Sequence, residues 1–365
     1  METATAHVAR RAAEEFDVTV VAATIDPGLR ALVHWSRVPV PARPFALKFG
    51  MFWAVAGARL RMHRGDLVHT VGAIVPNHVD LASVHYLHAV VDDDTRGSAA
   101  ETGRLRGFHH ALVHRLALAA ERWSYRPSRL RRFAAVSAGV GDDLAAAYPG
   151  IEVTITPNGV DTARYSPDPV DRARVRAEQA VADDELVAVF VGGDWVRKGL
   201  AAVIAALALA VRGGARVRLW VIGSGDADRY RALAADDDVA DLVTFFGFRP
   251  DAEHLLRGAD VFVLPSRYET FCLAAFEAAA VGLPLVVTPV PDVRALVRDG
   301  SGGVLVDPTG STAAAIAEAL RTYADDPARR AADGAAARAR ASAFTWDAAT
   351  ASVTDVYREL LESRP

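Results

Sequence analysis

The stretch DVFVLPSRYETFCLAAFEAAAVGLPLVVTP, residues 260–289, holds two short apolar segments with a helical segment between them. The apolar segments are near-continuous runs of Val, Leu and Phe, as expected for parallel strands that are covered on both faces. The helical segment carries Glu269 and Glu277 in an otherwise alanine-rich run. A strand, a helix and a second strand in this order predict a right-handed crossover within a doubly wound parallel sheet.

The same alternation of strand and helix continues through the second half of the chain. The other strand candidates there are 186–193, 217–225, 242–247 and 302–306. Strand candidates of the first half are 17–23, 66–72, 81–88, 131–138 and 152–159. The Asn-Gly and proline residues of 156–169 predict a linker between the halves. We therefore predict two Rossmann-like α/β domains, 1–160 and 161–343, followed by a closing helical segment, 344–365.

The composition excludes several classes of protein. A chain of 365 residues is longer than one hydrophobic core usually supports, and a net charge of −4 gives no general attraction to nucleic acid. Cys272 is the single cysteine, so no intrachain disulfide can form, which fits a cytoplasmic protein. Lys48 and Arg59 interrupt the apolar segment that begins at Phe45, so we interpret it as a partly buried helix rather than a membrane span.

Short polar motifs follow four of the predicted strands. They are GGDWVRKG (192–199), GSGD (223–226), FGFRPD (246–251) and SRYETF (266–271). Ligands of open α/β sheets bind outside the carboxyl ends of the strands, so we expect these motifs to line one crevice. Arg197 and Lys198 stand at the start of a predicted helix, where cations do not suit the helix dipole. Their position makes sense if an anion lies between them and the helix end, where backbone N–H groups also point. The alternative for this motif is a solvated basic turn.

The spacing of the two glutamates suggests an extended ligand. If the helix begins near Phe271, Glu277 lies about 12 Å along from Glu269. The free backbone N–H groups of Phe271, Cys272 and Leu273 lie between the two carboxylates. The stretch thus offers, in order, an acceptor for hydroxyl groups, an anion site and a second acceptor for hydroxyl groups. A nucleotide sugar has its groups in the same order: the sugar hydroxyls, the diphosphate and the ribose hydroxyls. The alternative is that Glu269 caps the helix and Glu277 lies on the surface.

These motifs together resemble those of a known family. The element ETFCLAAFE, with GGDWVRKG, VIGSGD, PNGVD (157–161) and DGSGGVLVDP (299–308), is similar to retaining glycosyltransferases of family 4. The resemblance covers most of residues 66–365. It implies the GT-B fold, in which two Rossmann-like doubly wound parallel-sheet domains face a cleft and the closing helix crosses back to the first domain.

The resemblance also implies roles for individual residues. Arg197 and Lys198 would hold the donor diphosphate and stabilise its growing charge, the task that a metal performs in other transferases. Glu269 would bind the donor sugar and Glu277 the ribose hydroxyls. The remaining donor-binding residues implied are Gly193, Gly223, Phe248, Phe271, Cys272 and Leu273. We therefore expect no metal and no cofactor apart from the nucleotide sugar, which is the donor substrate.

A histidine on the acceptor side is the last implied catalytic residue. We prefer His85 to His88, because His85 directly follows the strand. It would position or polarise sugar and acceptor hydroxyls, while a departing phosphate oxygen takes the acceptor proton on the same face. The alternative is a buried histidine whose hydrogen bonds are satisfied beside the sheet.

Two charged regions bear on the partners of the protein. Region 96–132 contains nine arginines against Glu101 and Glu121, and in family 4 such regions often face anionic acceptors or the inner membrane surface. A solvated helix face is the alternative. We interpret Asp92–Asp94 as an acidic loop tip, although the run could be mistaken for the metal-binding Asp-x-Asp motif of GT-A transferases.

The chain departs from the family pattern at its start. The family opens with a strand and a glycine-rich loop, whereas ATAHVARRAAEEFDVTVV matches the following helix and second strand. We expect either a start upstream of Met1 or the loss of that strand. The predicted function is a metal-independent retaining glycosyltransferase that acts on a glycan, lipid or small-molecule acceptor. The alternatives are a non-catalytic nucleotide-sugar-binding protein and a GT-B nucleotide-sugar epimerase.

Overall fold

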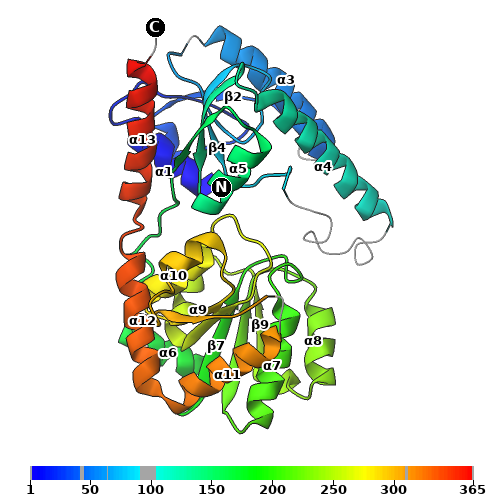
Figure 1. The fold of residues 1–365 in the computed structure, drawn as a ribbon, viewed down its shortest axis with the longest axis vertical. Coiled ribbons are helices and arrows are strands. Elements are labelled where there is room, and N and C mark those ends of the chain that lie inside the picture. The colour runs from blue at the N-terminus through cyan, green and yellow to red at the C-terminus, as the bar shows by residue number, and fades with distance from the viewer. Residues whose placement is uncertain (1, 42–44, 64, 91–103, 309–310, 364–365) are drawn as a thin grey trace. The chain divides into compact units, whose positions relative to one another are not determined.

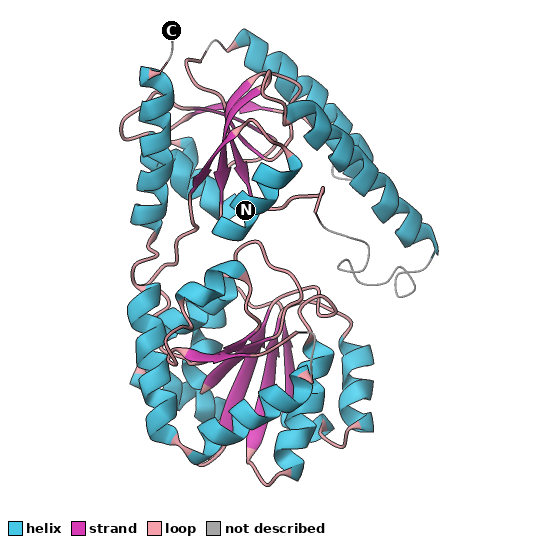
Figure 2. Ribbon diagram, in the orientation of Figure 1, coloured by secondary structure: helices cyan, strands magenta, loops and turns pink. Residues whose placement is uncertain are grey.

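The computed structural model describes residues 2–41, 45–63, 65–90, 104–308 and 311–363. The chain forms two compact units. Unit 1 contains Met1–Gly159 and Trp346–Pro365, and unit 2 contains Val160–Thr345. Each unit is a layered α/β structure (Figures 1 and 2).

Unit 2 is built on a six-stranded parallel sheet with helices on both faces (Figure 2). Its strands are β7 (Leu186–Val191), β8 (Val217–Ile222), β9 (Val243–Gly247), β10 (Val261–Leu264), β11 (Leu285–Val287) and β12 (Gly303–Leu305). Their spatial order is β12-β11-β10-β7-β8-β9, which is that of a doubly wound sheet. Every residue of β10 and β11 is buried, so the continuous apolar runs correctly predicted strands that are covered on both faces.

The helices of unit 2 fill the crossovers between these strands. They are α6 (Pro169–Glu178), α7 (Leu200–Arg212), α8 (Ala227–Asp236), α9 (Ala252–Gly258), α10 (Leu273–Val281), α11 (Thr312–Asp325) and α12 (Pro327–Ala341), with the short 3-10 helices η3 (Ala240–Leu242) and η4 (Pro291–Ala295). Helices α7 and α11 pack together on one face of the sheet, and α10 and α12 pack together on the other. Gly199 adopts a left-handed conformation at the N-cap of α7, which places this helix start two residues after Lys198.

Unit 1 contains two separate parallel sheets. The larger has the order β3-β4-β5-β6, and the smaller pairs β1 with β2. The strands are β1 (Thr19–Ala22), β2 (His34–Arg37), β3 (His69–Val71), β4 (Val79–Val84), β5 (Leu130–Ala135) and β6 (Glu152–Ile155). The candidate 81–88 is corrected to β4, which ends before His85. β2 was not predicted, because its short sequence HWSR has no apolar run.

The helices of unit 1 surround these sheets. They are α1 (Glu2–Ala12), α2 (Pro27–Arg30), α3 (Phe45–Met62), α4 (Arg104–Ser124), α5 (Ala138–Ala147) and α13 (Trp346–Glu362). Helix α13 packs on α1, and Tyr357 and Leu360 of α13 join Leu81 and Ala134 of the sheet in one buried cluster. In the described part of the chain, no helix is both long and apolar enough to span a bilayer.

Candidate active site

The loops that carry the predicted charged residues meet where the strand order of unit 2 reverses. β7 and β10 are neighbours in the sheet, and a switch point of this kind opens a crevice at the carboxyl ends of the strands. Lys198 follows β7 and Glu269 follows β10. Lys198 Nζ donates to Glu269 Oε1 at 2.5 Å, and the side chains are only 12% and 10% exposed. The fold therefore joins a cation and a carboxylate that lie 71 residues apart in the sequence.

Arg197 approaches the same carboxylate from a second direction. Its Nη1 lies 3.4 Å from Glu269 Oε1, and its Nε donates to Asp194 Oδ2 at 2.8 Å. The guanidinium also donates to the carbonyl oxygen of Tyr268, and Ser266 Oγ donates to Glu269 Oε1 at 2.8 Å. One carboxylate thus faces two cations, which are the groups that bind phosphate oxygens in proteins.

Glycines bring the backbones of two adjacent loops into contact. Gly223 has φ +129°, and a Cβ at this position would lie 2.1 Å from the carbonyl oxygen of Gly192. Gly193, the other predicted donor-binding glycine, would place a Cβ at an ordinary 3.5 Å from the carbonyl oxygen of Ser224. Close packing therefore requires glycine at 223 but not at 193.

Helix α10 begins at Leu273, two residues later than expected. The N–H group of Leu273 donates to the carbonyl oxygen of Phe271 at 2.9 Å. The prediction that this N–H group is free is therefore wrong. Cys272, at the N-cap, makes no side-chain capping bond, and burial raises the pKa of its thiol to about 12. Phe271 stacks on Phe276 with ring centroids 4.5 Å apart. The binding roles of Phe271, Cys272 and Leu273 stay predictions.

Glu277 lies in the middle of α10, and its surroundings favour the neutral acid. Desolvation by burial raises the pKa of Glu277 to about 7, although a hydrogen bond with Tyr165 and the charge of Arg164 oppose the rise. Tyr165 is 9% exposed. Sequence reasoning missed Tyr165, although an aromatic residue four positions after the motif PNGVD was the available signal. The surface position considered for Glu277 is wrong, because the side chain is half-buried.

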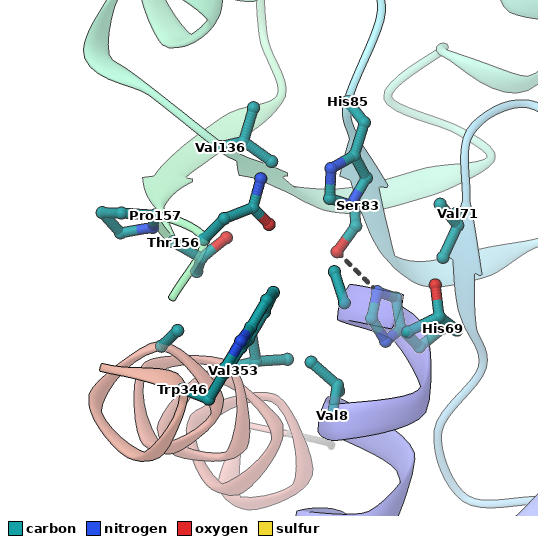
Figure 3. Close-up of a pocket in the computed structure, with 14 residues that line it drawn as sticks. Val8, His69, Val71, Ser83, His85, Val136, Thr156, Pro157, Trp346 and Val353 are labelled. Atoms are coloured by element: carbon teal, nitrogen blue, oxygen red, sulfur yellow. Dashed lines mark hydrogen bonds between the residues drawn. The ribbon is translucent and has the colours of Figure 1, made fainter. Parts of the chain in front are cut away.

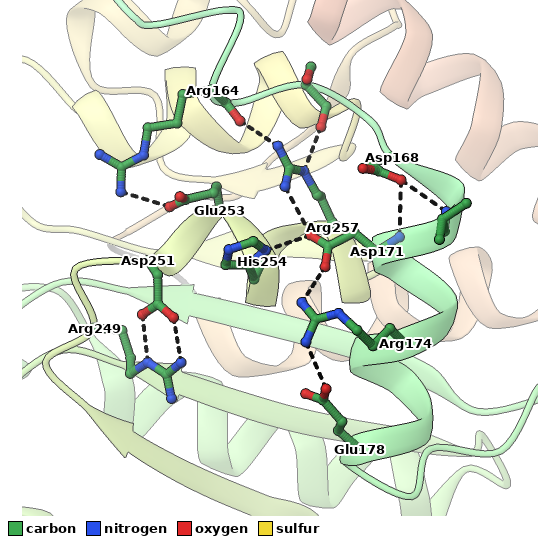
Figure 4. A network of polar contacts seen from close by, with 12 residues as sticks. Arg164, Asp168, Asp171, Arg174, Glu178, Arg249, Asp251, Glu253, His254 and Arg257 are labelled. Carbon is green, nitrogen blue, oxygen red and sulfur yellow. Dashed lines mark hydrogen bonds and ion pairs between the residues drawn. The ribbon is translucent and has the colours of Figure 1, made fainter.

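A network of ion pairs holds the segment around Tyr165 (Figure 4). Arg257 of α9 donates to the carbonyl oxygens of Ser166 at 2.9 Å and Arg164 at 2.6 Å, and to Asp171 Oδ2 at 2.9 Å. Burial opposes ionisation of Asp171, but hydrogen bonds from Arg257, His254 and Arg174 hold its pKa well below the usual range. Arg257 therefore fixes the chain on both sides of the tyrosine that contacts Glu277.

The predicted nucleobase region lies after β9. Phe248 is 75% exposed. Arg249, considered with it as a base contact, donates twice to Asp251, at 2.8 and 2.7 Å (Figure 4). An exposed phenyl ring at the carboxyl end of a strand is available to a ligand, and its role stays a prediction.

His85 of unit 1 lines a small cavity (Figure 3). Desolvation by burial lowers the pKa of His85 to about 4, so the imidazole is neutral near neutral pH. His88 instead donates its backbone N–H to Glu121 at 2.8 Å, and its ring contacts those of Tyr86 and His114. The preference for His85 stays a prediction.

Part of the basic region 96–132 serves internal contacts. Arg131 pairs with Asp80 at 3.2 Å, Arg132 pairs with Glu152 at 2.7 Å, and Arg129 donates to the carbonyl oxygen of Pro76 at 2.8 Å. Arg115 and Arg122 are exposed on α4. Residues 91–103, which include Asp92–Asp94 and Arg96, and the side chains of 104–110 lie outside the described part.

Two parallel-sheet α/β units, one of which has two cations facing one carboxylate at its switch point, fit the GT-B fold of glycosyltransferases. Residues 1–164 match the model of "Glycosyltransferase Family 4", and residues 185–326 match that of "Glycosyl transferases group 1". The chain is 32% identical over 358 residues to a D-inositol 3-phosphate glycosyltransferase of Kineococcus radiotolerans, across 89% of this chain and 78% of that one. The chain belongs to glycosyltransferase family 4.

Solved structures agree in fold. WaaG, a glycosyltransferase involved in lipopolysaccharide biosynthesis, superposes with a TM-score of 0.78 at 22% identity, covering 97% of this chain and 95% of that one. Anabaena Alr3699/HepE in complex with UDP-glucose superposes with a TM-score of 0.71 at 18% identity, covering 98% and 95%. The GT-B fold excludes the GT-A alternative that was considered for Asp92–Asp94.

Proposed function

We propose that this family 4 glycosyltransferase transfers a sugar from a nucleoside-diphosphate sugar to an acceptor hydroxyl with retention of configuration. The observation that carries the proposal is the largely buried cluster of Lys198, Arg197 and Glu269 at the switch point of unit 2. A donor diphosphate carries more charge than one carboxylate, so it can compete for both cations. Released from them, Glu269 is free to accept hydrogen bonds from the hydroxyls of the transferred sugar.

The same cations would act during the reaction. As the bond between the sugar and the diphosphate breaks, negative charge grows on the leaving oxygen, and two preorganised cations stabilise this charge without reorganisation. We propose that they replace a metal ion. A departing phosphate oxygen would take the acceptor proton on the face where the acceptor attacks, which gives retention. His85, neutral near neutral pH, would orient hydroxyl groups by hydrogen bonding.

The opposite end of the donor would lie near Glu277. A carboxylate has two oxygens that can accept from the two ribose hydroxyls. Tyr165 donates to Glu277 and so limits its orientation. Phe248, exposed at the end of β9, would contact the nucleobase.

The acceptor is the less defined substrate. The Kineococcus radiotolerans relative is named for a phosphorylated polyol, so inositol phosphate is the first acceptor to test. We propose that Arg115 and Arg122, exposed on α4, belong to a basic surface that faces an anionic acceptor or the inner membrane surface, where each cation contributes about 1 kcal/mol.

Thermal unfolding with UDP, GDP or ADP tests the donor site. A nucleotide at about 100 times its Kd should stabilise the protein by roughly 2.7 kcal/mol, and Glu277→Ala should abolish the shift. Stabilisation that survives in the variant would contradict the assignment of Glu277.

Turnover of UDP-glucose separates the alternatives. A transferase releases UDP when an acceptor is added, an epimerase converts the donor without an acceptor, and a binding protein does neither. Release of UDP should persist after treatment with a chelator; its loss, with recovery on adding manganese, would overturn the metal-independent mechanism.

A further inference from the structure

Unit 1 contains a cavity that combines an apolar wall with a few polar groups (Figure 3). Its volume is about 30 Å³, which is room for one hydroxyl group or one water. Valines and Trp346 form the apolar wall, whereas the polar groups are Ser83 of β4, His85 just after β4 and His69 of the neighbouring strand β3 (Figure 3). A polar site of this size suits a single oxygen atom of a larger ligand.

His69 lies between two hydroxyl groups. Its Nδ1 is 2.6 Å from Tyr357 Oη, and its Nε2 is 2.8 Å from Ser83 Oγ. Burial lowers the pKa of His69 to about 4, and the nearby His85 contributes to this shift. The ring is therefore neutral near neutral pH, with one nitrogen that donates and one that accepts.

Counting protons distinguishes the two possible arrangements. If Nδ1 donates to Tyr357, the phenolic proton needs another acceptor, and the described residues show no second partner for this buried hydroxyl. An unsatisfied buried donor is costly. If Tyr357 donates to Nδ1 instead, Nε2 donates to Ser83 Oγ, and the remaining proton is that of Ser83. Ser83 lines the cavity and Tyr357 does not, so only this second arrangement directs the leftover proton to a place where a ligand can accept it.

We infer that Tyr357, acting through His69, is a positioning residue that directs the Ser83 hydroxyl proton into the cavity, where it donates to a hydroxyl oxygen of bound sugar or acceptor. The kind of ligand rests on the proposed transferase function. The direction of the hydrogen bonds does not, because it follows from the contacts among the side chains of His69, Ser83 and Tyr357.

The direction of these bonds can be measured without any substrate. Long-range proton–nitrogen NMR of histidine-labelled protein shows which ring nitrogen carries the proton, and a His69→Gln sample identifies the signals of His69. We expect the proton on Nε2 in the wild-type protein near neutral pH. A proton on Nδ1, or a doubly protonated ring, would overturn the inference.

Activity then tests whether Tyr357 acts through Ser83. The probe is UDP release from UDP-glucose, with water or inositol phosphate as acceptor. Ser83→Ala should lower kcat/KM about five- to tenfold, the effect of one lost hydrogen bond. Tyr357→Phe should cost about threefold in the wild-type background and nothing further in the Ser83→Ala background, because the two residues act in one chain.

A merely structural role for Tyr357 gives a different result. The two losses would then multiply in the double variant, and this outcome overturns the inference. Midpoints of thermal unfolding check that each variant folds. If the wild-type protein releases no UDP, the proposed function fails with this donor, whereas the NMR measurement still decides the proton positions.

Discussion

Replacing Glu277 with glutamine should make the protein more stable at high pH while weakening its affinity for the nucleotide. The substitution keeps the shape and the contact with Tyr165 but removes the charge. In the wild-type protein, burial raises the pKa of Glu277 from 4.5 to about 7. The folded state therefore retains a proton that the unfolded state releases between these values, so the stability that this proton confers is lost as pH rises through about 7.

The size of the effect follows from the pKa. The rise from 4.5 to about 7 corresponds to about 3 kcal/mol at about 1.4 kcal/mol per pH unit. Because Glu277 keeps some contact with solvent, about 2–3 kcal/mol is the better expectation. Glu277→Gln should match the wild-type stability below about pH 4.5 and exceed it by this amount above about pH 8. A change of this size moves the midpoint of a domain as large as unit 2 by about 4–10 °C.

Thermal unfolding of both proteins between about pH 5 and pH 8.5 provides the assay. The unfolding transition of unit 2 is identified as the one whose midpoint temperature rises when a nucleotide is bound to the wild-type protein. Glu253→Gln is a matched control, because the pKa of Glu253 shifts the other way. Burial alone would raise this pKa, but the hydrogen bond from Arg164 opposes burial and the pKa of Glu253 is lowered on balance. That variant should be destabilised by a constant amount between about pH 6 and pH 8.5. If the stability difference between Glu277→Gln and wild type does not grow with pH, Glu277 is not a desolvated acid and the reasoning fails.

Three further predictions test other parts of the site. Lys198→Met should destabilise unit 2 by about 2 kcal/mol, because it leaves the largely buried Glu269 carboxylate with the Ser266 hydroxyl and with Arg197, 3.4 Å away, as its remaining cation. Adding Glu269→Gln should restore stability but not UDP affinity, and recovered affinity in calorimetric titration would contradict a phosphate-binding role for Lys198. Gly223→Ala should lower the free energy of unfolding by about 3 kcal/mol, because the backbone has a positive φ and the carbonyl oxygen of Gly192 fills the space that a Cβ would need. Gly193→Ala should change the free energy of unfolding by less than about 0.5 kcal/mol. Equal denaturation midpoints for the two variants would refute this contrast. Arg257→Gln should weaken UDP binding about tenfold by releasing the segment of Tyr165, and unchanged affinity together with a lower unfolding temperature would show that Arg257 acts on stability alone.

Local patterns in the sequence were sufficient to predict much of unit 2. Continuous apolar runs mark β7, β8, β10 and β11, because a strand buried on both faces has no room for polar side chains. The motifs after these strands lie at one edge of the sheet, because parallel strands place their carboxyl ends together. Arg197, Lys198 and Glu269 could therefore be assigned to one site from their positions after strands.

Contacts between distant segments could not be predicted in this way. Tyr165 and Glu277 lie on separate elements, and the raised pKa of Glu277 depends on burial that no local pattern encodes. His69 and Tyr357 are 288 residues apart, and β2 lacks the apolar run of a buried strand. With β2 as an exception, the strands and helices could be assigned from the sequence, because periodicity and turn residues act locally. The desolvation and pairing of polar groups follow from the packed fold, because packing brings groups from distant segments together and excludes water from them.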